Sequence, residues 1–234
     1  GGAIPGLRFP LGSGSSHGMS VRGSRLGGMS VDLPIRCDCG GVRGVASGQS
    51  SRTVNRVICH CSDCQAFAHY LDQADRVLDE HGGTDICQVS PRTVRFETGA
   101  DQLACVRLTA KGPYRWFAAC CRSPLANTVP GLPFAGLIRP TVQPDGAGLT
   151  TIHGRIFGCD AVGDPATLEA SRRIPLPLLG RVMRKLALRR LRGDHRHSPF
   201  HDHASGRATV KPTLLSPDQR EALEARRLAW PPGD

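Results

Sequence analysis

Three cysteines lie within six residues, at Cys59, Cys61 and Cys64, and this spacing could bring three sulfur atoms to one metal ion. Zinc takes cysteine thiolates at about 2.3 Å, usually in tetrahedral geometry. Three protein ligands are typical of catalytic zinc, whereas four are typical of structural zinc. We therefore interpret this group, called the cysteine trio below, as a set of three zinc ligands.

The trio has two alternative interpretations. The first is that the thiols are reduced and simply packed in the core, which is unusual for three cysteines among polar neighbours in one short segment. The second is redox chemistry through Cys61 and Cys64, which have the Cys-x-x-Cys spacing but lack the βαβ context of a thioredoxin-like motif. His60 and Asp63 stand between the ligands, where either could orient a ligand, move a proton or simply face solvent.

The other cysteines fall into two kinds. Cys37 and Cys39 form a Cys-x-Cys turn that offers two metal ligands and needs partners from elsewhere, and Cys120 and Cys121 are adjacent in the sequence. The remaining three are expected to be structural residues: Cys87, Cys105 and Cys159.

The composition limits the class of protein. Ten cysteines in 234 residues are too few for a small disulfide scaffold. No stretch approaches the roughly 18 consecutive apolar residues of a membrane span, and residues 1–28 lack the apolar core of a secretory signal. We therefore expect a reducing, cytoplasmic location, in which clustered cysteines indicate metal binding or catalysis.

The formal net charge of +10 is concentrated near the C-terminus, because residues 172–234 hold 14 Lys and Arg against 6 Asp and Glu. The segment from Arg181 to Arg196 is dense enough in cations to contact nucleic acid or an anionic membrane. It has no interleaved aromatic residues for base stacking, so we favour a solvated or packed helix over nucleic-acid binding. We interpret the alternating histidines that follow as a polar loop rather than a metal site: His195, His197, His201 and His203.

Short apolar runs between Gly and Pro turns predict the strands that must position these residues. We place strands at residues 33–42, 51–58, 84–89, 93–97, 103–109, 114–119 and 150–157. Apolar residues at helical spacing predict one helix over 65–80, ended by Gly82. A basic amphipathic helix is predicted over 179–192. A final helix is predicted to begin at Pro217, with Ser216 and Gln219 forming a capping box, and to end at Leu228.

Three motifs together resemble the glutathione-dependent formaldehyde-activating enzyme family, which includes centromere protein V. They are Cys37-Asp38-Cys39-Gly40, Cys59-His60-Cys61-Ser62-Asp63-Cys64-Gln65 and Tyr114-Arg115-Trp116-Phe117-Ala118-Ala119-Cys120-Cys121-Arg122-Ser123-Pro124-Leu125. The similarity covers roughly residues 33–158. It implies a mainly β fold, a zinc-binding β-tent of small antiparallel sheets, here with one inserted helix and a helical C-terminal tail. It also implies a carbon–sulfur lyase that acts on an adduct of formaldehyde with glutathione.

The resemblance assigns roles to individual cysteines. The trio matches the catalytic-type zinc ligands, and Cys37 with Cys39 matches half of a structural zinc site. In the other half Cys121 aligns, but Ala118 stands at the first cysteine position and Arg122 replaces a glycine. Cys120 is the candidate substitute, although adjacent cysteines reach one ion only with an unusual backbone. A three-thiolate site and the absence of a second site both stay open.

We predict three parts: a disordered leader over residues 1–28, or translated sequence upstream of a start near Met29; a zinc-binding domain over 29–163; and a basic, partly helical extension over 164–234. The function predicted from the resemblance is a zinc-dependent lyase-like activity on a thiol–aldehyde adduct such as S-hydroxymethylglutathione. The alternative is a non-catalytic zinc module whose basic tail contacts nucleic acid or another partner.

Overall fold

In a computed structural model of the protein, residues 30–142, 149, 151–163 and 167–230 are described, so the leader predicted over 1–28 lies outside them. The strands are β1 (Val31–Arg36), β2 (Arg43–Gln49), β3 (Asn55–Cys59), β4 (Thr84–Val89), β5 (Val94–Thr98), β6 (Leu103–Arg107), β7 (Tyr114–Ala118), β8 (Pro124–Thr128), β9 (Ala135–Ile138), β10 (Gly154–Ile156) and β11 (Thr213–Leu214). The α-helices are α1 (Ser62–Tyr70), α2 (Ala74–Val77), α3 (Leu176–Leu191) and α4 (Pro217–Leu228). Single turns of 3-10 helix lie at Pro91–Thr93, Ala100–Gln102, Arg139–Thr141, Gly158–Asp160 and Asp194–Arg196.

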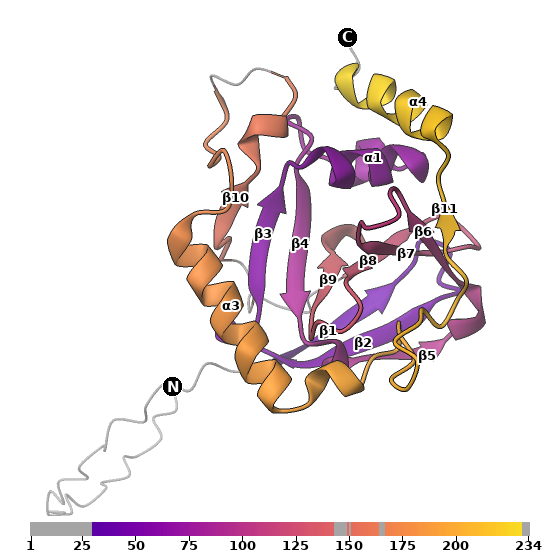
Figure 1. Ribbon diagram of the computed structural model, residues 1–234, viewed down its shortest axis with the longest axis vertical. Helices are drawn as coiled ribbons and strands as arrows, with labels where there is room; N and C mark the ends of the chain where they lie inside the picture. The colour runs from indigo at the N-terminus through magenta and orange to yellow at the C-terminus, as the bar shows by residue number, and fades with distance from the viewer. Residues whose placement is uncertain (1–29, 143–148, 150, 164–166, 231–234) are drawn as a thin grey trace, which may run out of the picture.

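Two sheets form the centre of the fold. The smaller has the strand order β1-β2-β5, and the larger has the order β10-β3-β4-β9-β8-β7-β6-β11. Pairing is antiparallel except between β10 and β3 and between β11 and β6. Figure 1 shows α3 alongside the β10–β3 edge of the larger sheet, and α1 with α4 together at one end of it. The predicted antiparallel sheets are confirmed, but four helices accompany the two sheets, so the fold is mixed α/β rather than mainly β.

The largest core lies between the two sheets. It contains Leu33 and Ile35 of β1, Trp116 of β7 and Leu137 of β9, all at most 2% exposed. Cys87 and Cys105 are buried in the same core, which confirms their interpretation as structural residues. Cys159 is instead exposed, so core packing does not explain it.

The helix predicted over 65–80 is divided in two. α1 ends at Tyr70, Asp72 takes a left-handed backbone conformation with φ of 54°, and α2 begins at Ala74. Short polar residues such as aspartate tolerate this conformation better than most, so the chain can reverse here. The apolar residues at helical spacing still pack into one core: Phe67, Leu71, Ala74 and Leu78. The spacing of the apolar residues therefore identified the buried side chains of this segment but not the break between α1 and α2 at Asp72.

Four strands were not predicted: β2, β8, β9 and β11. β11 has only two residues, Thr213 and Leu214, which pair with β6. β2 carries small residues in place of an apolar alternation, and every residue of β8 and β9 is buried, which removes the period of two. The predicted strand over 51–58 corresponds to β3, which begins at Asn55, and that over 150–157 corresponds to β10.

The C-terminal residues pack into the same cores as the central sheets. Phe200 is fully buried in the core that contains Trp116, while Leu215 and Leu223 join the core beneath α1. α4 has the predicted capping box, in which Ser216 accepts a hydrogen bond from the backbone of Gln219. The boundary placed near residue 164 stays a prediction. Among the described helices, none is long and apolar enough to cross a membrane.

Candidate metal centres

The cysteine trio lies at the junction of β3 and α1. Cys59 is the last residue of β3, Cys61 caps the N-terminus of α1, and Cys64 lies in its first turn. The Sγ atom of Cys59 is 3.3 Å from that of Cys61 and 3.8 Å from that of Cys64. Four sulfurs placed tetrahedrally around zinc at about 2.3 Å would be about 3.8 Å apart. The three thiols are therefore close enough to share one ion.

Arg115 of β7 approaches the trio from a buried position. Its Nη1 atom lies 3.8 Å from Cys64 Sγ and donates a hydrogen bond to Asn127 Oδ1 at 3.1 Å. Its Nη2 atom lies 3.3 Å from the carboxylate of Asp63. The Arg115 side chain is only 2% exposed, so its charge is little screened by water. A fixed cation next to three thiols favours their ionised, metal-binding form.

The shifts in pKa place the negative charge mainly on Cys64. Hydrogen bonding with Cys61 and Cys64 raises the pKa of Cys59. For Cys61, the hydrogen bond with Cys59 lowers the pKa, but the hydrogen bond with Cys64 and burial outweigh it and raise the pKa. Hydrogen bonds from the Cys59 and Cys61 thiols, together with the charge of Arg115, hold the pKa of Cys64 well below its ordinary value although burial opposes this. Burial also opposes the charge of Arg115, but the negative charges of Cys64, Cys61 and Asp63 outweigh it and raise the pKa of Arg115. Cys64, Asp63 and Arg115 thus form a charge-paired group, which is how buried charges are tolerated.

A cavity of about 280 Å³, called the trio cavity below, opens beside these residues. All three cysteines of the trio line it, together with Asp63, Arg115 and Asn127. The rest of its lining is largely apolar: Val57, Ile86, Gln88, Pro113, Val129, Phe134, Ile156, Phe157 and Ile174. A mostly apolar cavity with a few convergent polar groups is the usual form of a small-molecule site.

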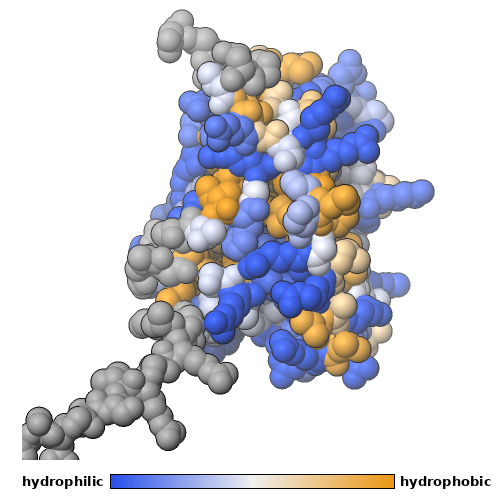
Figure 2. All heavy atoms as spheres, turned by 90° about the vertical axis from the view of Figure 1, so that its left-hand side faces the viewer, coloured by the Kyte–Doolittle hydropathy of each residue, from blue (hydrophilic) through white to orange (hydrophobic). Residues whose placement is uncertain are grey.

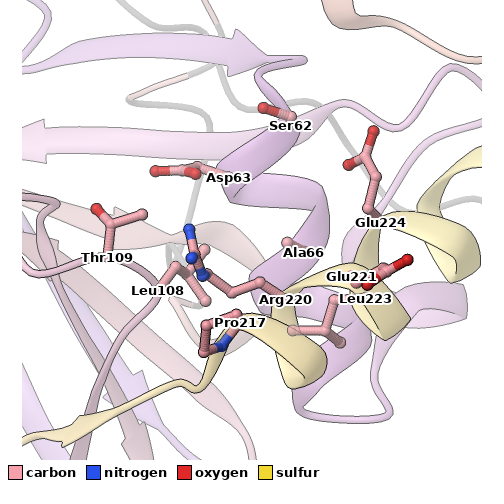
Figure 3. A pocket seen from close by; sticks show the side chains of 10 residues that line it. All are labelled: Ser62, Asp63, Ala66, Leu108, Thr109, Pro217, Arg220, Glu221, Leu223 and Glu224. Carbon is pink, nitrogen blue, oxygen red and sulfur yellow. The ribbon is translucent and has the colours of Figure 1, made fainter.

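Asp63 also borders a second cavity, of about 360 Å³, between α1 and α4. Figure 3 shows Arg220 extending from α4 towards Asp63, with Thr109 on the opposite wall and Glu224 further along α4. The Asp63 side chain is 43% exposed, and so solvent reaches this carboxylate while it contacts Arg115.

His60 lies between two ligands of the trio but does not line the trio cavity. Its ring is fully buried, with Nδ1 3.2 Å from the carbonyl oxygen of Ile156 and Nε2 3.8 Å from a carboxylate oxygen of Asp79. Burial lowers the pKa of His60, so the neutral ring donates from Nδ1 to Ile156. The Gln65 side chain binds the His60 carbonyl oxygen at 2.5 Å. His60 is therefore placed to fix the loop between Cys59 and Cys61.

A second cluster joins two distant turns. Cys37 and Cys39 follow β1, whereas Cys120 and Cys121 lie between β7 and β8, and their four Sγ atoms are within 4.8 Å of one another. The separations include 3.5 Å from Cys37 to Cys39, 3.2 Å from Cys39 to Cys120 and 3.8 Å from Cys120 to Cys121. We call this group the four-cysteine cluster. Both it and the trio are geometrically able to hold a metal such as zinc.

The backbone explains how two adjacent cysteines share this cluster. Arg122 adopts a left-handed conformation with φ of 59°, and its N–H binds the carbonyl oxygen of Ala118. The N–H of Ala118 in turn binds the carbonyl oxygen of Ser123, which closes a tight turn around both thiols. Ala118 and Arg122 are the two positions that differ from the motif of the formaldehyde-activating family. Their backbone hydrogen bonds close the turn that presents Cys120 and Cys121.

Ser123 supports the second cluster directly. Its hydroxyl lies 3.1 Å from Cys121 Sγ and also accepts a hydrogen bond from the backbone of Asp38. Burial opposes ionisation of Cys121, but hydrogen bonds from Ser123 and from the backbone of Cys39 lower its pKa to about 6. Ser123 therefore links the two turns and stabilises a thiolate at the same time.

Among the described residues, the groups of three or more metal-ligating side chains with suitably close ligand atoms are these two clusters. Within the described ranges, the histidines after α3 do not form a third such group. Arg115 and Asn127 are site residues that the sequence did not reveal. The available signal was an arginine between two aromatic residues of an otherwise apolar strand, where a charged side chain implies a buried partner.

Comparison with known proteins supports a family but not an activity. Residues 29–211 match a family described as a family of unknown function (DUF6151). No curated protein matches the chain. The match includes both cysteine clusters and α3, and the chain therefore belongs to this family of unknown function.

Proposed function

We propose that the protein is a zinc-dependent, carbon–sulfur lyase-like enzyme that acts on an adduct of a small thiol with an aldehyde, such as S-hydroxymethylglutathione. The observation that carries the proposal is the arrangement of the trio: three thiols at the wall of a largely apolar cavity, backed by the buried cation Arg115. The motifs that resemble the formaldehyde-activating family, with its β-tent fold, support the same reaction class.

The reaction needs no further reactant. In the cleavage direction, the carbon–sulfur bond of the adduct breaks and its electron pair stays on sulfur, while the hydroxyl group loses its proton and becomes the aldehyde carbonyl. The proton then passes to the departing sulfur, so a thiol and an aldehyde leave. Zinc held by Cys59, Cys61 and Cys64 would supply a Lewis acid that lowers the pKa of a thiol or polarises an oxygen.

The side chains around the cavity divide the remaining tasks. Asp63 lines the trio cavity and is partly exposed, so we assign it the transfer of the proton between the adduct hydroxyl and sulfur. Arg115 holds Asp63 and compensates the charge of the thiolates, which positions both for the reaction. His60 is a positioning residue in this proposal, since its ring anchors the loop between two ligands to Ile156.

The test combines metal analysis with a turnover measurement. Wild-type protein should contain zinc and should accelerate exchange between free formaldehyde, glutathione and their adduct, as followed by NMR exchange spectroscopy. The triple variant Cys59→Ser/Cys61→Ser/Cys64→Ser should lose one zinc per chain and the acceleration. Cys159→Ser removes an exposed cysteine outside both clusters and is the matched control. Unchanged zinc content in the triple variant would overturn the assignment of the ligands.

A second candidate function is a non-catalytic zinc module. It is favoured by the four-cysteine cluster, because four protein ligands are typical of structural zinc. This alternative predicts the same loss of zinc in the triple variant but no acceleration by the wild type with glutathione or with any other small thiol. The two readouts together therefore separate the candidates.

A further inference from the structure

A cavity of about 340 Å³ lies between α3 and the turn that precedes β3, and cationic side chains make up most of its lining. The cations are Arg52, Arg181, Arg184, Lys185, Arg189 and Arg192, and Thr53 with Leu188 completes the lining. We call it the cationic groove. Figure 2 faces the side of the molecule that carries α3 and shows hydrophilic side chains spread across it. Acidic residues are absent from the lining that the structure describes.

Three of the cations form the floor of the groove and are bound to neutral acceptors. Arg181, Lys185 and Arg189 donate hydrogen bonds of 2.7–2.8 Å to the turn before β3 and to its first residue. The acceptors are the carbonyl oxygens of Ser51, Thr53 and Val54 and the side-chain oxygen of Asn55. Such bonds fix the orientation of the cations but leave their positive charge uncompensated.

The other three cations stand at the rim with their side chains free. Arg52, Arg184 and Arg192 are exposed, and within the described part of the chain their guanidinium groups have no hydrogen-bond acceptor and no carboxylate partner. A guanidinium presents several N–H donors in a planar fork that matches the oxygens of a phosphate group. The rim thus offers unused donors above a fixed positive floor.

The like charges oppose one another in the absence of an anion. Lys185 is 8% exposed, and burial together with Arg181, Arg189 and Arg184 lowers its pKa to about 7. Arg189 is equally buried, and the acid that acts on it, Asp194, is bound to the hydroxyl of Ser90. A multiply charged anion in the groove would relieve this repulsion, which is a favourable contribution to binding.

We propose that the cationic groove binds a compact polyanion of the phosphate class, such as inorganic pyrophosphate or the phosphate chain of a nucleotide. From Arg181 to Arg192 the helix rises about 16 Å, which suits a few linked phosphate groups better than a single carboxylate. A small ligand fits better than nucleic acid, because the described residues that line the groove include no aromatic side chain for base stacking. The site is independent of the proposed lyase function.

The test uses inorganic pyrophosphate and the full-length protein, with binding measured by isothermal titration calorimetry in 0.15 M chloride. The variant Arg184→Gln/Arg192→Gln removes two rim cations that hold no other part of the fold. The control Arg173→Gln/Arg207→Gln removes two exposed arginines outside the groove and gives the same change in net charge. We expect the affinity of the rim variant for pyrophosphate to fall at least about tenfold, because the loss of one hydrogen bond to a charged group lowers affinity by about that factor. The control variant should bind pyrophosphate like the wild type.

Three outcomes would overturn the proposal: no binding by the wild type, equal losses in both variants, or displacement of pyrophosphate by equimolar acetate. A single-stranded oligonucleotide is added in a separate arm. If it binds to the wild type but not to the rim variant, and pyrophosphate does not displace it, the groove is a nucleic-acid surface and the proposal of a small polyanion is wrong. Competition by pyrophosphate, with the affinity of both ligands reduced in the rim variant, supports the proposal.

Discussion

The two cysteine clusters have similar sulfur separations but very different surroundings. Cys59 and Cys64 are buried at the wall of a cavity, next to a buried arginine and a carboxylate. In the four-cysteine cluster, Cys39 and Cys120 are exposed, and the hydrogen bonds around the thiols come from the turns themselves. The trio also comes from one short segment, whereas Cys37 and Cys120 are 83 residues apart.

This difference separates two uses of the same ligand chemistry. A cluster that joins distant segments restricts the unfolded chain, because it closes a long loop, and so it contributes mainly to stability. A cluster within one segment closes almost no loop and so adds little to stability. Its role depends instead on whether a substrate can reach an open coordination position of the ion. A metal ion held by the four-cysteine cluster would tie the turn after β1 to the turn after β7, and therefore the smaller sheet to the larger one.

The largest effect that this comparison predicts is on turnover. Cys61→Ser removes one ligand of the trio, and we expect the exchange of formaldehyde with glutathione to slow at least about 100-fold, the scale for loss of an electrostatic contribution to a transition state. Cys120→Ser, its counterpart in the other cluster, should stay within about threefold of the wild type at 25 °C. Equal losses in the two variants would remove the functional distinction between the clusters.

The second effect is on stability, and here we expect the larger loss from a substitution in the four-cysteine cluster rather than in the trio. Cys39→Ser should cost about 3 kcal/mol of unfolding free energy, a fraction of the roughly 10–16 kcal/mol of structural zinc sites. For a chain of this size that corresponds to about 6–12 °C in melting temperature. Cys61→Ser should lower the melting temperature by less than half as much as Cys39→Ser does, because the trio closes only a short loop. Differential scanning calorimetry with and without chelator measures both, and a larger loss in Cys61→Ser would contradict the comparison.

Arg115 gives a third and smaller effect that concerns one cluster alone. Arg115→Met keeps the length of the side chain but removes the charge beside Cys64, so zinc affinity at the trio should fall about 10–100-fold, as for other residues that support metal ligands. Arg115→Lys should recover part of this, because it keeps the charge but loses the fork that binds Asp63 and Asn127. Competition with a chelating dye resolves the two sites, and the four-cysteine cluster should be unaffected.

The sequence was sufficient for features whose signal is local. The trio is visible as three cysteines in six residues, and the capping box at Ser216 is a four-residue pattern. The strands that carry apolar alternation could be placed to within a few residues, as for β4 and β7. In each case the residues that determine the structure are adjacent in the chain, so no knowledge of the tertiary fold is needed.

The features that could not be predicted depend on contacts between distant segments. The sequence did not establish which cysteines form the four-cysteine cluster, because Ala118 and Arg122 depart from the pattern of the formaldehyde-activating family. The left-handed turn that brings Cys120 and Cys121 together has no sequence signature of its own. Arg115 could be recognised as a site residue only once β7 was paired with β8 and placed against α1. The break at Asp72 and the cationic groove likewise follow from how α1, α2 and α3 pack.

A fourth predicted effect concerns β7, the strand that connects the clusters. Arg115 projects from it to the trio, Cys120 and Cys121 follow its end, and Trp116 packs in the core with its ring 5.8 Å from that of His201. The Thr128 hydroxyl accepts from Trp116 and lies 2.8 Å from His201 Nε2, so it can donate its own proton to the neutral ring. Burial lowers the pKa of His201 to about 4.

Between pH 4 and 6.5 the unfolded chain therefore binds a proton at His201 that the folded protein does not, and stability falls as the pH falls through this window, by at most about 1.4 kcal/mol per unit. Acid also protonates thiolates, which would release zinc held by either cluster. The variant His201→Gln separates the two causes, since it keeps an acceptor for Thr128 but cannot titrate. Its unfolding free energy in urea should decline less steeply than that of the wild type between pH 6.5 and 5. Parallel profiles would mean that acid acts on the clusters themselves and not on the strand between them.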